Sequence, residues 1–367
     1  MDVRPLRPYM WALALGAFVP VSWVLAILAA PGVFLFAVAG LAIVPLAWFL
    51  GLATEELGKH AGPGVGGLLN ATFGNATEMI IALFALASGL HEVVKASLTG
   101  SIIGNILLVL GLSMLAGGLR NKRQVYSREA SGIQTTMLLL AVVGLVMPEL
   151  YSLSIGLPST MTVAEKGRIV RDVSLAVAGI LFLAYLFGLW FSLRTHRDVF
   201  NPVAEVHTPP RWSVRASVAI LLVATAIVAI ESELLVRSIE AARASLGLTE
   251  LFVGVIIVAI VGNAAEHGSA VIMAIRNKMD LSVAIATTST TQIALFVAPV
   301  LVFASVVLGN FLTLNFEIFE LAAIALSAAI LASVVADGQS NWYEGALLVM
   351  VYAIIGVAFF YHPTVGP

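Results

Sequence analysis

Two five-residue segments place carboxylate and amide groups in the middle of long apolar stretches. Residues 74–78 read GNATE and residues 262–266 read GNAAE, so four of the five positions match. In each segment the asparagine precedes the glutamate by three residues, a spacing that puts both side chains on one face of a helix. Carboxylate and amide oxygens are the ligands that hard cations such as Ca²⁺ prefer. The segments therefore predict a cation site built from oxygen atoms.

A second polar patch follows each segment inside the next apolar stretch. TGSIIGN ends at Asn105 and TTSTTQ ends at Gln292, at nearly the same distance after the two glutamates. A spacing of four puts Ser101 on the helix face of Asn105, and Thr288 has the same relation to Gln292. The predicted metal ligands are Glu78, Glu266, Asn75, Asn263, Asn105, Gln292 and Ser101.

The composition places these segments in a membrane. Of 367 residues, 60% are hydrophobic and only 11% are charged, against about 25% charged in soluble proteins. Many apolar runs exceed the roughly 20 residues that cross a bilayer as a helix, and they lack the alternation of barrel strands. An all-α integral membrane protein follows, with about eleven spans at 9–29, 33–57, 63–90, 91–118, 129–147, 168–193, 213–236, 248–275, 280–308, 316–335 and 342–362.

The charges of the chain restrict its partners and predict its orientation. A net charge of −2 gives no basic footprint for nucleic acid, and the absence of cysteine excludes thiolate sites and disulfides. Lys and Arg predominate in loops on the side of the N-terminus, which predicts a cytoplasmic N-terminus and an outside C-terminus. Arg4 and Arg7 precede a long apolar run that is expected to remain as a first span rather than a signal peptide. A prokaryotic cytoplasmic membrane is expected, with a vacuole-like compartment as the alternative.

The matching segments indicate an internal repeat. They fall on the third and eighth spans, five apart, so the two copies cross the bilayer in opposite directions. Inverted repeats with a site at the midplane are common in secondary transporters. The proline-containing stretch between the sixth and seventh spans is the natural linker. The predicted division is an N-terminal helix at 1–32, repeats at 33–193 and 213–367, and a cytoplasmic linker at 194–212.

Two carboxyl groups near the bilayer centre suggest coupled exchange. An ionised carboxylate there costs about 2.5 kcal/mol or more, so each glutamate either binds a cation or takes up a proton. If the protein changed its open side only when Ca²⁺ or protons occupied the glutamates, and never with the charged site empty, it would exchange Ca²⁺ for protons by alternating access. The alternative is that each carboxyl is neutral and hydrogen-bonded to a neighbouring helix. No cofactor is expected; the transported ions would be Ca²⁺ and H⁺.

Further charged residues flank the site. Glu55 and Glu56 end the second span, and Glu231 and Glu233 lie near the end of the seventh, with Glu233 expected to be the deeper of that pair. Vestibules that attract cations and simple solvation of helix ends are equally compatible with these clusters. His267 follows Glu266 and could tune protonation, although a packed histidine is the simpler interpretation.

The motifs resemble those of the Ca²⁺/H⁺ antiporter (cation/proton exchanger) family of the Ca²⁺/cation antiporter superfamily. The resemblance rests on GNATEMIIALFAL, SIIGNILLVLG, GNAAEH and TTQIALFVAP. It implies two inverted five-helix repeats as in Na⁺/Ca²⁺ exchangers, Ca²⁺ export driven by protons, and gate helices at the second and seventh spans. It also implies that Glu78 and Glu266 bind the ion. The linker departs from many relatives, because only Asp198 and Glu205 are acidic there.

Other functions are weighed against this interpretation. Na⁺/Ca²⁺ exchangers usually carry a proline before the motif glutamate, where this chain has Thr77 and Ala265. Exchange of Mn²⁺ or of monovalent cations for protons fits the same ligands, and a channel could use the same carboxylates. An enzyme is disfavoured, because neither an HExxH motif nor a nucleophile elbow is present.

Overall fold

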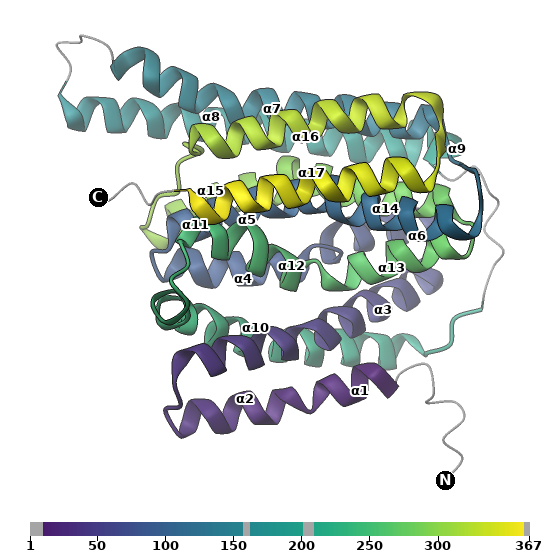
Figure 1. Ribbon diagram of the computed structural model, residues 1–367, viewed down its shortest axis with the longest axis horizontal. Coiled ribbons are helices and arrows are strands. Elements are labelled where there is room, and N and C mark those ends of the chain that lie inside the picture. Colours follow the sequence, from purple (N-terminus) through teal and green to yellow (C-terminus); the bar gives the residue numbers. More distant parts are fainter. Residues whose placement is uncertain (1–9, 157–161, 201–208, 363–367) are drawn as a thin grey trace.

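The computed structural model describes the chain except for residues 1–9, 157–161, 201–208 and 363–367 (Figure 1). The described part is almost entirely helical, since backbone groups in a bilayer must pair within the segment. Nine of its helices are long and apolar enough to span a membrane. A tenth candidate is the pair Glu250–Gly262 and Ala264–Ile275, bent by 62° at its break. The all-α membrane class is confirmed, whereas the count of eleven spans stays a prediction.

The first half of the chain contains eight α-helices and two π-helices before the linker. They are α1 (Met10–Gly16), α2 (Phe18–Ile27), α3 (Gly32–Phe73), α4 (Ala76–Ala87), α5 (His91–Ile103), π-helix η2 (Gly104–Val109), α6 (Leu110–Arg120), α7 (Arg128–Gly156), α8 (Val163–Trp190) and π-helix η3 (Phe191–Thr195). The short helix α9 (Arg197–Phe200) begins the linker.

The second half repeats much of this order. Its helices are α10 (Val214–Leu246), α11 (Glu250–Phe252), π-helix η4 (Val253–Val258), α12 (Ala259–Gly262), α13 (Ala264–Ile275), α14 (Met279–Gln292), π-helix η5 (Ile293–Val297), α15 (Ala298–Leu308), α16 (Ile318–Val334), 3₁₀ helix η6 (Val335–Asp337) and α17 (Trp342–Tyr361). Two short strands, β1 (Gln124–Val125) and β2 (Gln339–Ser340), pair antiparallel and join the loops after α6 and η6.

Corresponding elements of the two halves start at a constant separation. Figure 1 shows α4 and α13 starting near the middle of the bundle and running toward opposite ends, as an inverted repeat requires. The separation is 188 residues for three pairs of helix starts: Ala76 and Ala264, His91 and Met279, and Leu110 and Ala298. The repeat boundaries near the linker stay predictions, and Arg4, Arg7 and Glu205 lie outside the described residues.

The third span, expected at 63–90, is not one continuous helix: residues 63–73 belong to α3, and α4 begins only at Ala76. Helix α3 continues beyond residue 57 as far as Phe73, with a kink at Gly62, whose φ of 82° lies in the left-handed region that favours glycine. The chain then turns at Gly74 and Asn75 before α4 begins. The corresponding chain of the second half leaves α10 at Gly247, also left-handed with φ of 67°, and reaches Gly262 through α11, η4 and α12.

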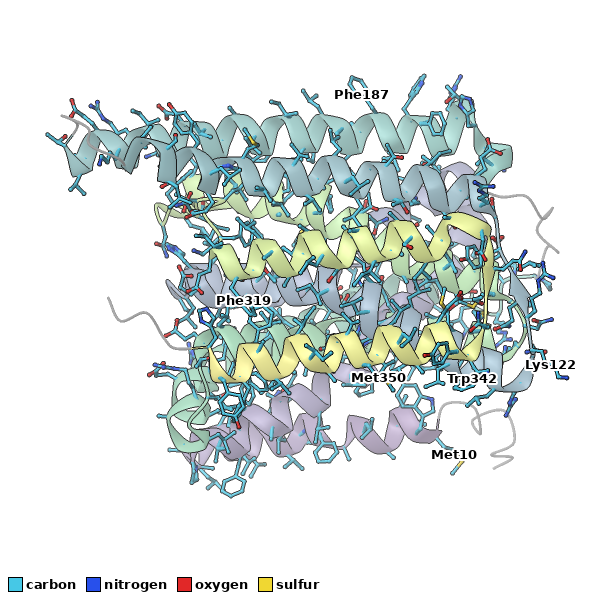
Figure 2. All side chains as sticks on the ribbon, turned by 45° about the horizontal axis from the view of Figure 1, so that its top comes forward. Met10, Lys122, Phe187, Phe319, Trp342 and Met350 are labelled. Atoms are coloured by element: carbon cyan, nitrogen blue, oxygen red, sulfur yellow. The ribbon has the colours of Figure 1, made fainter. Side chains whose placement is uncertain are left out.

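The outer surface of the bundle is apolar, as a lipid-facing surface must be. Figure 2 shows Phe187 and Met350 pointing away from the helices, and these side chains are 72% and 59% exposed. Charged residues gather at the ends of the helices instead, as Lys122 illustrates (Figure 2). Met10 lies toward the same end of the bundle as Lys122, which agrees with the expected side of the N-terminus.

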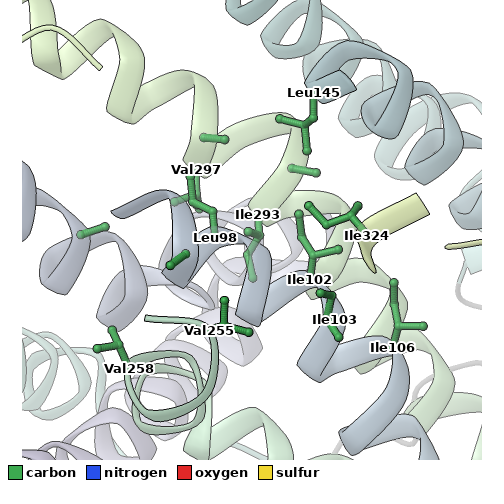
Figure 3. Close-up of a cluster of buried hydrophobic side chains, with 14 of the residues drawn as sticks. Leu98, Ile102, Ile103, Ile106, Leu145, Val255, Val258, Ile293, Val297 and Ile324 are labelled. Atoms are coloured by element: carbon green, nitrogen blue, oxygen red, sulfur yellow. The ribbon is translucent and has the colours of Figure 1, made fainter. Parts of the chain in front are cut away.

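The core brings the two halves into backbone contact. Buried side chains from both halves, among them Leu98, Ile102, Val255 and Ile293, meet in one cluster (Figure 3). A Cβ on Gly100 would lie 2.0 Å from the carbonyl oxygen of Val255, so α5 and η4 approach too closely for any larger residue.

We expect Gly100→Ala to separate α5 from η4 and to lower stability by about 1–3 kcal/mol, as overpacking does. A drop in the melting temperature of the purified protein in detergent would report it. Gly179→Ala in α8 is the matched control, since nothing lies within 4 Å of the added Cβ. Equal melting temperatures for the two variants would contradict the close approach.

Candidate ion-binding site

The two signature segments both interrupt a helix. Asn75 separates α3 and Gly74 from α4, and Asn263 separates α12 from α13, with backbone angles close to each other at φ −99°, ψ 23° and φ −89°, ψ 7°. Glu78 and Glu266 therefore stand in the first turns of α4 and α13. Helix N-termini carry partial positive charge, so both half-helices favour a carboxylate at this place.

Asn75 is held by two residues of α14. Its Nδ2 donates to Oε1 of Gln292 at 2.6 Å, and its Oδ1 accepts from the hydroxyl of Ser289 at 3.0 Å. All three side chains are buried or nearly so. The first break is thereby tied to the polar patch of the other half.

Asn263 has the corresponding partners on α5 and η2. Its Nδ2 donates to the hydroxyl of Ser101 at 2.8 Å, and its Oδ1 accepts from Nδ2 of Asn105 at 3.3 Å. Asn105 Nδ2 also donates to Ser289 at 2.9 Å, which connects the two sets into one network. The structure thus brings together all five predicted amide and hydroxyl ligands.

Ser289 joins the two halves of the network, although the sequence pointed to Thr288. Ser289 lies 188 residues after Ser101, the same separation as the repeat, and Gln292 is only three residues further on rather than four. The longer side chain of glutamine makes up for the missing residue. The repeat separation of 188 residues, applied to Ser101, would have identified Ser289 from the sequence. The hydroxyl of Thr288 accepts a hydrogen bond from Gln134 at 3.3 Å instead.

The two glutamates face the opposite signature glycines. A Cβ on Gly262 would lie 3.0 Å from Cγ of Glu78, and one on Gly74 would lie 3.5 Å from Oε1 of Glu266. Glycine at these positions leaves room for the carboxylates where the segments cross. The site is therefore formed between the two halves and by neither alone.

The carboxylates carry free acceptor oxygens inside the protein. Glu78 is 6% exposed, and neither of its oxygens has a hydrogen-bond partner among the described residues. The same holds for Oε2 of the half-buried Glu266 and for Oδ1 of Asn105. Buried polar atoms normally have partners, so these oxygens mark a place for a cation or protons. Within the described ranges no group of three or more His, Cys, Asp and Glu could hold a metal ion, so the amide and hydroxyl oxygens would have to contribute.

The acidic residues of α3, Glu55 and Glu56, both pair with Lys59 rather than lining an open vestibule. Glu56 is 1% exposed, accepts from the backbone N–H groups of Arg211 and Trp212 at 2.5 and 3.2 Å, and pairs with Lys59 at 2.7 Å. It ties the end of the linker to α3. Glu55 has an exposed side chain and pairs with the same lysine at 2.8 Å.

The expected depth of the acidic residues in α10 is wrong. Glu231 is fully buried and accepts from the hydroxyl of Ser22, while the more exposed Glu233 pairs with Arg237. Residues two apart point about 200° apart on a helix, so only one of the pair can face the protein. Apolar neighbours in the sequence did not show which one. His267 is half-buried next to Glu266, and its tuning role stays a prediction.

The fold and the site define an integral membrane protein of the inverted-repeat exchanger class, with two carboxylates at opposed helix breaks. The model of the family described as sodium/calcium exchanger protein matches residues 31–194 and 216–361, and the chain belongs to that family.

The chain is 47% identical to a Ca²⁺/H⁺ antiporter of Aphanothece halophytica, covering 95% of both chains. It is 45% identical to the Ca²⁺/H⁺ antiporter ChaA of Bacillus subtilis, covering 94% of this chain and 97% of that one. The solved structure of native YfkE matches with a TM-score of 0.82 at 40% identity, over 96% of this chain and all of the other.

We expect Ser289→Ala to destabilise the site, because Asn75 loses a donor and Asn105 loses an acceptor. The loss should be about 1–3 kcal/mol, the usual cost of unsatisfied buried groups. Thr288→Ala is the matched control, since its single long contact should cost much less. Thermal unfolding of both purified variants is the measurement, and a larger effect at Thr288 would contradict the assignment.

Proposed function

We propose that the protein is a secondary active transporter that exchanges cytosolic Ca²⁺ for protons, with Glu78 and Glu266 binding either Ca²⁺ or H⁺. One observation carries this proposal: at opposed helix breaks, two carboxylates lie against each other's signature glycine and have oxygens without a hydrogen-bond partner among the described residues. Relatives named Ca²⁺/H⁺ antiporters, similar over nearly the whole chain, support the choice of ions. No enzymatic activity and no cofactor are part of the proposal.

The ligand set fits a divalent hard cation. Two carboxylates neutralise Ca²⁺, and Asn105 adds an amide oxygen that has no partner in the part of the chain that the structure describes. Ca²⁺ takes six to eight oxygen ligands in flexible geometry. The remaining ligands would come from the amides of Asn75, Asn263 and Gln292 and the hydroxyls of Ser101 and Ser289, whose hydrogen bonds to one another would rearrange around the ion.

Coupling follows from the cost of an empty site. Two bare carboxylates in this enclosed position would repel each other and would lack the solvation of water. Ca²⁺ removes both costs, and so do protons on the carboxyl oxygens. A transporter that changes its open side only in these two neutral forms must return with protons after delivering Ca²⁺. The bound Ca²⁺ is therefore exchanged for H⁺ rather than leaked.

A difference between the halves supports alternating access. Gly254 of η4 packs against α5, where an added Cβ would lie 2.4 Å from Cβ of Ala96. Val253 beside it is fully buried, whereas Val65, its counterpart 188 residues earlier, is 52% exposed. The facing helices differ likewise, since Val93 of α5 is 1% exposed and Leu281 of α14 is 49% exposed. One entrance is closed by η4 and α5, and the other is open between residues 63–73 and α14.

We assign the open entrance to the cytoplasm. It lies at the start of α14, beside the loop of Arg276 and Lys278, and basic loops stay on the cytoplasmic side. The N-terminus would then be cytoplasmic and the C-terminus outside. Movement of α3 and α10 against the site helices would close this entrance and open the other, exchanging the environments of the two repeats, 33–193 and 213–367.

The first test is ⁴⁵Ca²⁺ uptake into proteoliposomes under an imposed pH gradient. We expect gradient-driven uptake by the native protein, unaffected by Na⁺, and a loss of at least about 100-fold in Glu78→Gln, since one binding charge is gone. Glu233→Gln, with its exposed ion pair, is the control that should transport normally. Uptake that follows a Na⁺ gradient would instead assign Na⁺/Ca²⁺ exchange. Proton-coupled flux of Mn²⁺ or a monovalent cation without Ca²⁺ flux would reassign the substrate.

The open entrance can be tested with single cysteines, because the chain has none of its own. We expect Val65→Cys to react quickly with a membrane-impermeant thiol reagent from the cytoplasmic side. Val253→Cys should react at least about tenfold more slowly from either side, since such a reagent reaches only thiolates exposed to water. Mass spectrometry of labelled protein in oriented vesicles gives both rates. Equal rates for the pair would contradict the asymmetry, and fast labelling of Val65→Cys only from outside would reverse the orientation.

A further inference from the structure

A buried carboxyl group of α10 lies outside the four segments that build the ion site. Glu231 is 0% exposed and stands near the middle of the 33-residue helix. Its Oε1 accepts from the hydroxyl of Ser22 at 2.8 Å, and its Oε2 has no partner in the part of the chain that the structure describes. A carboxyl group within a membrane-spanning helix is costly and marks a functional place by default.

The partner of Glu231 comes from the N-terminal helices. Ser22 is the buried residue of α2, whose other side chains include Val24 and Ile27 at 53% and 82% exposure. Its hydroxyl also approaches the carbonyl oxygen of Val19 at 2.7 Å. Both α1 and α2 precede residue 31, where the match to the family begins. Figure 1 shows them along the edge of the bundle next to α3 and α10.

We propose that Ser22 is a positioning residue that joins α2 to α10 through Glu231, so that the N-terminal helices move with α10 during exchange. This inference rests on the alternating access of the proposed function. Detachment of α2 would leave both oxygens of Glu231 without a donor in an apolar surrounding. The side chain of Trp23 in α2 also bonds to the Glu231 carboxyl, so both of these polar contacts to α10 come from α2. The less exposed apolar side chains of α2 pack against α3. The hydrogen bond therefore couples α2 to α10 in addition to the apolar packing of α2 on α3.

Cross-linking in the cysteine-free chain tests this directly. The pair Ser22→Cys and Glu231→Cys, bridged by a small membrane-permeant bifunctional thiol reagent, should retain most of the ⁴⁵Ca²⁺ exchange rate of the same protein before bridging. The matched control is Gly40→Cys with Val261→Cys, which bridges α3 to α12 and should stop exchange until the bridge is reduced. The two positions are adjacent, since a Cβ on Gly40 would lie 3.5 Å from Cγ2 of Val261. Reversible inhibition by the Ser22–Glu231 bridge would overturn the inference. Exchange that survives the control bridge would instead refute alternating access as proposed.

Three variants decide the outcome if the double-cysteine protein fails to transport. Ser22→Ala should lower the melting temperature by about 2 °C, the effect of one lost hydrogen bond, and should reduce the maximal exchange rate several-fold at an unchanged half-saturating Ca²⁺ concentration. Ser22→Thr keeps the hydroxyl and should behave like the native protein.

Replacing Glu231 by Leu in the Ser22→Ala protein should restore the melting temperature, because no acceptor is then left unsatisfied. A native maximal rate in Ser22→Ala, or a change in half-saturation alone, would overturn the positioning role. The melting temperatures remain informative even if Ca²⁺ proves not to be the substrate.

Discussion

The structure depends on one electrostatic constraint, which is that two carboxylates lie inside the protein without a balancing Lys, Arg or His partner among the described residues. Glu78 and Glu266 stand on helices from different halves and face each other's signature glycine. Neither has a basic partner among the ion pairs of the described residues. A soluble protein would solvate such groups at its surface; within a membrane they require a cation or protons. The arrangement of half-helices, amides and glycines around them can be understood from this requirement.

The surroundings reduce the electrostatic cost without neutralising the site. Each glutamate occupies the first turn of a half-helix, where the helix dipole favours negative charge. The amides and hydroxyls of the network satisfy one another and so hold the two breaks in place. Since the network spans α4, α5, α13 and α14, the site helices form one unit. Helix α10 and the part of α3 before its kink at Gly62 pack outside this unit, which is where relative motion between packed bodies would occur.

The two faces of this unit are held differently. On the face closed by η4, Lys95 of α5 donates to the carbonyl oxygen of Asn315 at 2.8 Å, and Thr99 donates to the buried Glu320 of α16 at 2.9 Å. On α14 the hydroxyl of Thr287, the counterpart of Thr99, bonds to its own helix at Val283 instead. The two halves therefore share most of their helix order but differ in these polar contacts, as they also differ in the path of the chain between α10 and Gly262 and its counterpart in α3.

The sequence by itself determined the class of the protein, the four polar segments, the two carboxylates and the opposed directions of the repeats. It could do so because apolar length, carboxylate cost and repeat spacing are local properties of the chain. Only the tertiary structure decided that Glu231 rather than Glu233 is buried, and that Glu56 ties the linker to α3. These outcomes depend on which neighbour each helix face meets, and that choice is made by packing between segments up to about two hundred residues apart.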